Sequence, residues 1–447
     1  MRNPKGTAAR AVPVAMALVI GTWLVSSSSG GARGVLGLAG AMSSVGLPAI
    51  ASQATPLPTP TDGTSSPTPD PTPASALRVQ RNELVNALGQ PLTLRGVNRA
   101  DPAYPCVQGW GIFEGPSDTA SIAALRSWRV NAVRLPLNEH CWLGINGVAP
   151  MYSGTLYQQA VVDYVSLLNA NGLYAIVDLH WSAPATALAT GQQPMPDLDH
   201  AVAFWSSVAA AFKGNDAVIL DLFNEPWPDD QRDSAAAWTC WRDGGTCPGV
   251  PFQAAGMQTL VDVVRGTGAT NVIALGGVSY SNALSQWLAY KPSDPLNGLV
   301  ASWHVYDFNI CSTIACFGNT VAAVAARVPL VATEIATDTC DAVFFADLMG
   351  WLDAHQSGYL AWTWNTWGDA CAAKSLIRDY AGTPTTYGQL YRDHLATLLP
   401  CTSARGDPAA GSDRAGPYRL ADRVCRNARR SERLDHALFE THPAGPT

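Results

Sequence analysis

The stretch AVILDLFNEP, residues 217–226, holds the features on which the fold prediction depends. Its apolar run Val218–Leu220 is continuous, as expected of a strand that is covered on both faces. The run Ala175–Val177 has the same character. Polar residues follow the apolar part, and in this stretch they include Asn224 and Glu225. The pattern indicates a buried parallel strand with candidate functional residues at its C-terminal end.

Similar apolar runs recur along the chain, and amphipathic stretches separate them. We predict strands at Leu92–Val97, Asn131–Leu137, Ala175–Trp181, Val218–Asn224, Asn271–Gly276, Leu299–Tyr306, Leu330–Glu334 and Tyr359–Trp364. Apolar residues at helical spacing occur in Leu156–Leu168, in Ala201–Phe212 and in the stripe Phe344, Leu348, Trp351 and Leu352. Strand–helix alternation of this kind predicts a parallel sheet with helical crossovers.

The predicted fold is α/β, a single (β/α)8 TIM barrel that forms one catalytic domain over residues 76–400. A barrel of this kind takes roughly 250 residues or more, so the available length fits. An open doubly wound sheet is the competing arrangement. The sequence has neither a Gly-x-Gly-x-x-Gly loop nor a Walker-type lysine, and eight strand–helix units favour closure.

The segments that flank the barrel have a different composition. Residues 1–54 contain basic residues followed by an apolar stretch, which predicts a signal peptide or a membrane-targeting segment. A start codon placed too early and an uncleaved anchor are the alternatives. Residues 55–75 are rich in Pro, Thr and Ser and predict an extended linker. Residues 401–447 carry many charges and predict a poorly ordered tail.

The composition excludes some partners and indicates a compartment. A net charge of −7 disfavours nucleic acid and anionic membrane surfaces, and we expect no stable membrane span after processing. Ten cysteines favour an oxidising environment, so we expect a secreted, extracellular protein, with cell-envelope tethering as the alternative. Connectivity is not fixed by sequence, but proximity suggests the pairs Cys106 with Cys141, Cys240 with Cys247, Cys311 with Cys316, and Cys340 with Cys371.

Nearly every predicted strand ends in a polar or aromatic residue. The C-terminal ends of the strands are where (β/α)8 barrels carry their active sites. The residues at these ends include Arg95, Asn98, Arg134, Asp178, His180, Asn224, Glu225, His304, Tyr306, Glu334, Trp362 and Trp364. Glu225 and Glu334 close the fourth and seventh strands, from which two side chains can converge across the mouth. Either glutamate alone could be an ordinary cap or ion-pair partner. Together they match the two carboxyls that glycoside hydrolysis needs.

Several of these residues fit a sugar site. Arg134 is the cation expected to keep Glu334 charged, and Asn224 could hydrogen-bond a sugar 2-hydroxyl. His304 and Tyr306 lie two apart on one strand and therefore face the same side. Trp362 offers a flat apolar face for a pyranose ring. Tryptophans in loops at strand ends are further candidates for subsites, namely Trp110, Trp142, Trp181, Trp227, Trp238 and Trp241.

Taken together, these residues resemble glycoside hydrolase family 5, the cellulase-type family of the (β/α)8 clan. The pieces that carry the resemblance are Leu94–Asn98, Asn131–Pro136, Asp178–Trp181, Phe223–Pro226, His304–Tyr306, Thr333–Glu334 and Ala361–Trp364. The resemblance implies Glu225 as acid/base and Glu334 as nucleophile. It implies that Arg134 and Tyr306 orient and ionise the nucleophile. It makes His180, Asn224, His304 and Trp362 the remaining site residues.

We therefore predict a retaining β-glycosidase that cleaves a β-linked polysaccharide or oligosaccharide, with an endo-β-1,4-glucanase as the first hypothesis. A β-mannanase, an exo-acting β-glycosidase and a non-catalytic carbohydrate-binding barrel are the alternatives. We expect a monomer that needs no cofactor and no metal. A serine esterase is disfavoured because the sequence has no Gly-x-Ser-x-Gly elbow.

Overall fold

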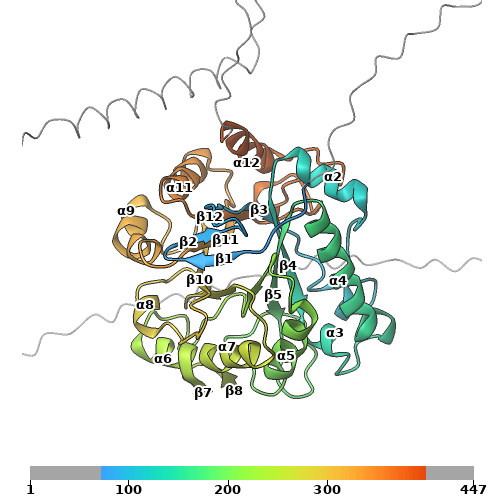
Figure 1. Cartoon of the computed structure of the whole chain (residues 1–447), viewed down its shortest axis with the longest axis vertical. Coiled ribbons are helices and arrows are strands. Elements are labelled where there is room, and N and C mark those ends of the chain that lie inside the picture. The colour runs from blue at the N-terminus through green and yellow to red at the C-terminus, as the bar shows by residue number, and fades with distance from the viewer. Residues whose placement is uncertain (1–71, 399–447) are drawn as a thin grey trace, which may run out of the picture. The chain divides into compact units, whose positions relative to one another are not determined.

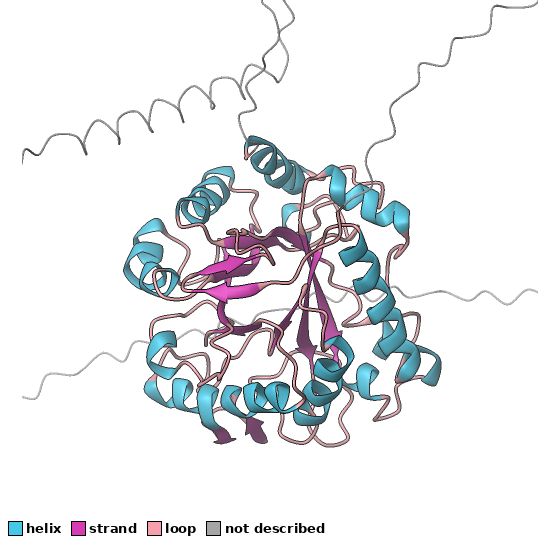
Figure 2. Ribbon diagram, viewed as in Figure 1, coloured by secondary structure: helices cyan, strands magenta, loops and turns pink. Residues whose placement is uncertain are grey.

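Eight parallel strands close into a barrel in the computed structural model, which describes residues 72–398 (Figure 1). Helices surround this ring of strands (Figure 2). The (β/α)8 fold predicted from the sequence is thereby confirmed. The segments 1–54 and 401–447, most of 55–75, and the cysteines at positions 401 and 425 lie outside the described residues.

All eight predicted strands are present in the barrel. They are β3 (Arg95–Asn98), β4 (Ala132–Asn138), β5 (Tyr174–Trp181), β6 (Val218–Asp221), β9 (Ile273–Gly276), β10 (Leu299–Tyr306), β11 (Leu330–Ala336) and β12 (Gly358–Ala361). They neighbour one another in chain order, and β12 pairs with β3 to close the ring. Two antiparallel hairpins lie outside the ring: β1 (Arg78–Gln80) with β2 (Glu83–Val85), and β7 (Gly244–Thr246) with β8 (Gln253–Ala255).

The α-helices are α1 (Pro105–Gln108), α2 (Thr119–Ser127), α3 (Glu139–Leu143), α4 (Thr155–Ala170), α5 (Ala201–Phe212), α6 (Ala235–Asp243), α7 (Met257–Gly266), α8 (Trp287–Tyr290), α9 (Ile314–Cys316), α10 (Ala322–Ala325), α11 (Ala342–Ala354) and α12 (Thr386–Thr397). Short 3-10 turns span Pro150–Tyr152 and Cys371–Ala373, and a π-helical turn spans Phe317–Val321. None of the helices within 72–398 is both long enough and apolar enough to cross a membrane.

Two strands end earlier than the sequence suggested. The ladder of β6 stops at Asp221, because the backbone after this residue hydrogen-bonds first to β9 and then to β5. Leu222 N donates to the Ala274 carbonyl, whereas Asn224 N donates to that of Leu179. The ladder of β12 stops at Ala361 in a similar way. Both irregular segments lead directly into predicted site residues.

The stripe predicted in α11 is slightly rotated in the structure. Phe345, Leu348, Met349 and Leu352 are its buried residues, so the buried face includes Phe345 where the prediction had Phe344. The predicted stripes of α4 and α5 are buried as expected. These helices pack over the outer face of the barrel and form the larger of two hydrophobic clusters.

The smaller hydrophobic cluster fills the end of the barrel opposite the active-site mouth. Leu77 and Leu84, from the β1–β2 segment, pack there with residues at the beginnings of the barrel strands, such as Tyr174 and Val300. Just upstream, Ala74 N donates to the Asn169 carbonyl at the end of α4. The β1–β2 hairpin therefore covers the N-terminal end of the barrel.

Four disulfides link loops and helices around the barrel, and they are the four pairs suggested by proximity: Cys106–Cys141, Cys240–Cys247, Cys311–Cys316 and Cys340–Cys371. Two of them, Cys106–Cys141 and Cys340–Cys371, join segments from neighbouring strand-end connections. They fix loops at the end of the barrel that carries the site.

Close approach of β3 and β4 requires a glycine at position 96, because an added Cβ would collide with the carbonyl oxygen of Ala132. We expect Gly96→Ala to lower the free energy of unfolding by about 2 kcal/mol or more, measured by urea denaturation. Gly350 lies in α11 with open space around it. Gly350→Ala should be neutral or stabilise by up to about 1 kcal/mol. Equal stability of the two variants would contradict this account of the strand contact.

Candidate active site

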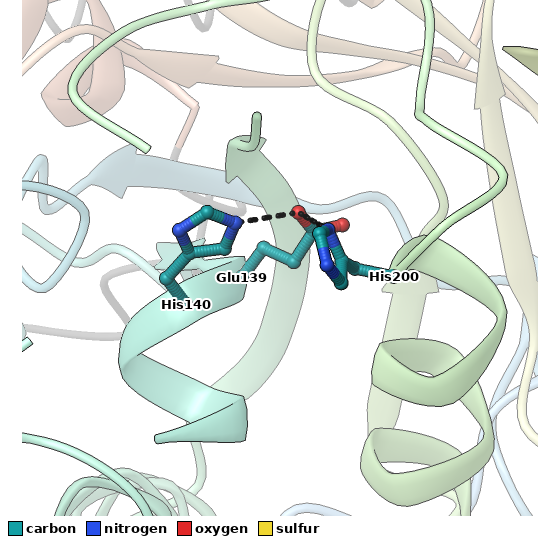
Figure 3. A group of neighbouring side chains, drawn as sticks. All are labelled: Glu139, His140 and His200. Carbon is teal, nitrogen blue, oxygen red and sulfur yellow. Dashed lines mark ion pairs between the residues drawn. The ribbon is translucent and has the colours of Figure 1, made fainter. Parts of the chain in front are cut away.

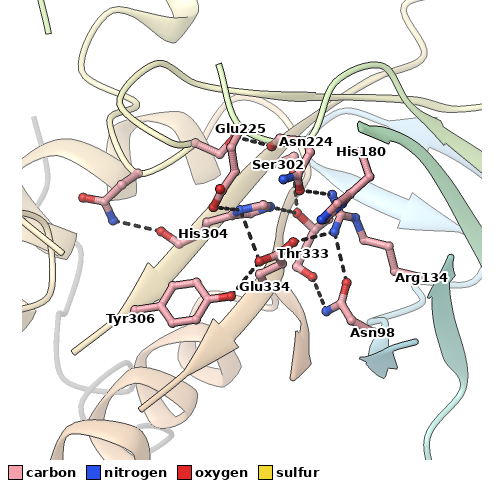
Figure 4. Close-up of polar contacts among 12 residues, drawn as sticks. Asn98, Arg134, His180, Asn224, Glu225, Ser302, His304, Tyr306, Thr333 and Glu334 are labelled. Carbon is pink, nitrogen blue, oxygen red and sulfur yellow. Dashed lines mark hydrogen bonds and ion pairs between the residues drawn. The ribbon is translucent and has the colours of Figure 1, made fainter. Parts of the chain in front are cut away.

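The two glutamates singled out in the sequence converge across the mouth of the barrel (Figure 4). Glu225 follows β6, and Glu334 lies in β11. One carboxylate oxygen from each lies within 4.8 Å of the other. Carboxyl groups about 5–5.5 Å apart suit a double displacement, whereas a separation of roughly 6.5–9.5 Å would leave room for a water molecule.

Glu334 receives a hydrogen bond at each of its oxygens. Arg134 Nη1 donates to Oε1 over 2.7 Å, and the Tyr306 hydroxyl donates to Oε2 over 2.6 Å. The Glu334 side chain is nearly inaccessible to water. A cation and a second donor therefore stabilise a negative charge on this carboxylate in a poorly solvated place.

Arg134 is itself completely buried and held on several sides. Its Nε donates to Asp221 Oδ2 over 3.1 Å, and its Nη2 lies 3.2 Å from Asp178 Oδ2. Asn98 and Asn224 accept from Nη1 and Nη2 through their side-chain oxygens. The guanidinium cannot rotate away without breaking these contacts, so its position relative to Glu334 is fixed by β3, β4, β5 and β6.

Glu225 has no cation of this kind beside it. His304 Nδ1 lies 2.9 Å from Glu225 Oε1, and His304 Nε2 lies 3.0 Å from Thr333 Oγ1. Burial lowers the pKa of His304 to about 4, so the ring is neutral near pH 7. Burial raises the pKa of Glu225 to about 7, an effect that His180 and Gln192 oppose. The two glutamates therefore occupy opposite electrostatic environments.

Asn224 keeps one donor free for a ligand. Arginine can only donate, so the Asn224 oxygen faces Arg134 at 2.9 Å and the amide nitrogen points elsewhere. That nitrogen is buried and has no hydrogen-bond partner within the described chain. A buried donor without a partner is costly, which indicates that an acceptor is supplied from outside the protein.

His180 and Trp362 complete the predicted set on the other side of the pocket. His180 Nδ1 lies 2.9 Å from Asp178 Oδ2, the same oxygen that contacts Arg134. The Trp362 ring stacks on His180, with centroids 5.5 Å apart and an interplanar angle of 6°. Direct contacts, or contacts through Asp178, thus connect all eight residues that the sequence singled out.

Several residues of the network were not assigned to the site from the sequence. Asp221 holds Arg134, and its signal was visible as an acid within an otherwise apolar strand. Asp178 was noted only as a strand-end residue, although it contacts both Arg134 and His180. Gln192 lies in the long connection between β5 and α5, where no periodic pattern marks it.

The tryptophans predicted in strand-end loops fall into three groups. Trp142, Trp238 and Trp241 lie on the helices α3 and α6; they are completely buried and belong to the core, so they cannot form sugar subsites. Trp227 stacks on the Tyr280 ring, with centroids 5.7 Å apart. Around Tyr104, at the mouth, lie the rings of three other tryptophans, with centroids 5.9–6.3 Å from the Tyr104 ring, namely Trp110, Trp181 and Trp367. Trp110 and Trp367 are roughly half exposed. Trp367 follows the last strand and was missed in the sequence.

Comparison with known proteins places this geometry in a family. Residues 85–370 match the family described as cellulase (glycosyl hydrolase family 5). A mannan endo-1,4-beta-mannosidase from Salipaludibacillus agaradhaerens is 24% identical over 319 residues, which are 68% of this chain and 86% of that protein. An endoglucanase from Halalkalibacter akibai is 30% identical over 158 residues, 34% of this chain and 17% of that protein.

Solved structures show the same fold. A β-glucanase from Saccharophagus degradans has a TM-score of 0.55 at 18% identity, covering 74% of this chain and 98% of that one. A β-mannanase from Thermomonospora fusca has a TM-score of 0.53 at 18% identity, covering 71% and 93%.

The buried position of Arg134 predicts a large effect of its removal. Arg134→Met leaves Asp178, Asp221 and Glu334 without their cation, so we expect the free energy of unfolding to fall by about 3–5 kcal/mol in urea denaturation. Arg232 pairs with Asp229 on the surface, with 64% of its side chain exposed. The control Arg232→Met should change stability by less than about 1 kcal/mol. Similar losses in both variants would contradict a special role for the buried cation.

Proposed function

This chain belongs to glycosyl hydrolase family 5, and from that membership we propose an endo-acting β-1,4-glucanase with Glu334 as nucleophile and Glu225 as acid/base. It is a retaining β-glycoside hydrolase, and its substrate is a carbohydrate. The observation that carries the assignment of roles is the contrast between the two carboxyls. Glu334 is bonded to a buried cation, whereas Glu225 faces a neutral histidine and has a raised pKa.

In the first step, a Glu334 oxygen attacks the anomeric carbon while Glu225 donates its proton to the departing glycosidic oxygen. The Tyr306 hydroxyl and Arg134 hold the attacking carboxylate in place. The product is a glycosyl-enzyme ester on Glu334 and a free sugar hydroxyl. The step therefore needs no reactant other than the two glutamates and the sugar chain.

In the second step, the Glu225 carboxylate takes a proton from water, and the water oxygen attacks the anomeric carbon. The ester bond breaks, Glu334 is released as a carboxylate, and Glu225 is protonated again. A pKa of about 7 suits both roles, because neither protonation state is costly near neutral pH.

The remaining residues fit recognition of a sugar chain. The unpartnered Asn224 amide can donate to the 2-hydroxyl of the sugar at the reaction centre. Trp362 offers its face beside His180, and the aromatic group around Tyr104 extends the apolar surface at the mouth. Aromatic side chains at more than one place around the mouth support binding of several sugar units, as endo-acting cleavage requires.

A β-mannanase is the second candidate. The mannanase relative aligns along 68% of this chain, whereas the endoglucanase relative aligns along 34%. Glucose and mannose differ only in the orientation of the 2-hydroxyl, the group that the Asn224 donor is positioned to meet. The choice between the two polymers therefore depends on a very local contact.

We also propose that the protein is exported and acts as a monomer. Support for export comes from the four disulfides of the described chain, which persist in oxidising compartments. Their placement around the mouth suits an enzyme that must keep its loops ordered outside the cell.

Reducing-sugar release from β-glucan, mannan and xylan tests the function. We expect strong release from β-1,4-glucan, and Glu334→Ala should lower kcat by about 10⁴-fold or more while binding of the polymer persists. Leu88→Ala, a change at an exposed side chain after β2 and away from the barrel mouth, is a control for handling and folding. Release from mannan alone would select the second candidate. Near-normal turnover by Glu334→Ala would overturn the assignment.

The raised pKa of Glu225 predicts the alkaline limb of the pH profile. Glu225 must be protonated to assist departure of the leaving sugar. We therefore expect kcat/KM on a polymer to fall about tenfold per pH unit above pH 7. An aryl glycoside with a good leaving group needs little protonation, so Glu225→Gln can still be glycosylated by it. The rate of that glycosylation step should no longer fall above pH 7. Rapid-mixing measurement of the phenol burst checks this. An alkaline limb that survives in Glu225→Gln would assign it to another group.

A further inference from the structure

Just after β9, the chain makes a tight turn through residues 279–282 beside the candidate active site. Ser279, Tyr280 and Ser281 have φ angles of 55°, 59° and 58°. These are left-handed backbone conformations, which residues other than glycine normally adopt singly and at a cost in free energy. A run of three such residues persists only where contacts with the surrounding structure fix it.

Two glycines allow this turn to fold back onto the end of β9. A Cβ added at Gly276 would collide with Ser281 Oγ, and one added at Gly277 would collide with the Ala283 carbonyl oxygen. Val278 forms a β-bridge with Ala283, whose N–H donates to the Val278 carbonyl over 3.1 Å. The Ser281 side chain is completely buried. The turn is therefore a packed extension of the barrel wall.

The turn holds the backbone on both sides of Glu225. Ser281 Oγ donates to the Asn224 carbonyl over 2.8 Å. The Tyr280 N–H donates to the Pro226 carbonyl over 3.0 Å. The carbonyls that precede and follow Glu225 are thus both bonded to the same few residues.

The turn also holds the backbone of His304, the partner of Glu225. The His304 N–H donates to the Ser281 carbonyl over 3.1 Å, and Asn282 Nδ2 donates to the His304 carbonyl over 2.8 Å. The Asn282 side chain is fixed in turn, because its oxygen accepts from the Cys311 N–H over 2.9 Å. Cys311 belongs to the disulfide with Cys316. Both backbone polar groups of His304 are therefore bonded to the turn.

Regular strand pairing from β9 does not extend as far as these two residues. The ladder from β9 ends at Asp221 in β6 and at Ser302 in β10. Glu225 and His304 lie beyond those positions, and on this side the turn takes over from the ladder. It thereby carries the backbone geometry of the barrel to the contact between His304 Nδ1 and Glu225 Oε1, which are 2.9 Å apart.

We propose that Ser281 and Asn282 are positioning residues for the acid/base, because their turn sets the backbone of Glu225 relative to that of His304. The proposal rests on the proposed function, in which Glu225 protonates the leaving oxygen. A proton is transferred efficiently only within hydrogen-bond reach of its acceptor. A displacement of about 1 Å can lower a rate about a hundredfold. Both residues act through the backbone of others.

Two variants remove the hydroxyl that holds the Asn224 carbonyl. Ser281→Ala removes it with the least change of volume. Ser281→Gly removes it and introduces a residue that adopts the left-handed conformation readily, which guards against a failure to fold. The matched control is Ser153→Ala, because Ser153 is also buried and its Oγ donates to a backbone carbonyl, that of Ala149, over 3.1 Å.

Nitrogen-15 NMR of the His304 ring, in the full chain, measures the contact without turnover. The ring signals should follow the protonation of Glu225, with a midpoint near its pKa of about 7. Burial is what raises this pKa, so a loosened backbone that admits water should lower the midpoint by about half a pH unit or more in both Ser281 variants. Other groups that act on this pKa are unchanged in the variants, namely His180, Gln192, Arg134 and Asp178.

A series of aryl β-glycosides with leaving groups of increasing pKa measures proton donation. On the least acidic leaving group, kcat/KM of Ser281→Ala should fall about tenfold or more, and the loss should shrink as the leaving group becomes more acidic. A purely structural role would lower kcat/KM equally across the series.

The proposal is overturned by a uniform loss across the series, by a His304 midpoint that stays at its wild-type value in both Ser281 variants, or by equal changes in Ser153→Ala. If the wild-type protein hydrolyses none of these glycosides, the proposed function fails, and the His304 titration still decides whether Ser281 positions Glu225.

Discussion

One buried guanidinium organises the active end of this barrel. Arg134 contacts Asp178, Asp221 and Glu334, so a single positive charge faces three carboxyls from three other strands. Burial raises the pKa of Asp221, whereas Arg134 lowers it. Of the three contacts with the guanidinium, the one to Glu334 is the shortest, at 2.7 Å.

Two glutamates of identical chemistry are thereby given different properties by their surroundings alone. Glu334 has a donor at each oxygen, and one of those donors is charged. Glu225 faces the His304 ring, which burial keeps neutral. The difference originates in which strand ends carry arginine and tyrosine, and the barrel brings those ends together from positions far apart in the chain.

The strands and the pair of glutamates could be predicted because each has a local signature. A continuous apolar run such as Val218–Leu220 identifies a covered strand, and a polar residue at its end identifies the mouth. The pairing of Arg134 with Glu334 followed from the same logic. Strand ends were less predictable, since the turn after Asp221 depends on hydrogen bonds to β5 and β9.

Contacts made by the long β5–α5 connection could not be foreseen. Gln192 and His200 have no periodic pattern, and their partners Glu225 and Glu139 come from other elements, as Figure 3 shows for His200 and Glu139. Tryptophan burial was similarly beyond sequence reasoning: Trp142 and Trp110 were both predicted in strand-end loops, yet Trp142 lies on α3 in the core and Trp110 is half exposed. Such outcomes depend on tertiary packing that no local window contains.

The β1–β2 hairpin makes the two ends of the barrel different. It closes the base of the barrel with Leu77 and Leu84, and residue 74 is bonded to the end of α4 on that same side. The described chain therefore begins at the end of the barrel opposite Glu225 and Glu334. One end of the barrel is closed by this first hairpin, and the other is framed by the connections that follow the barrel strands.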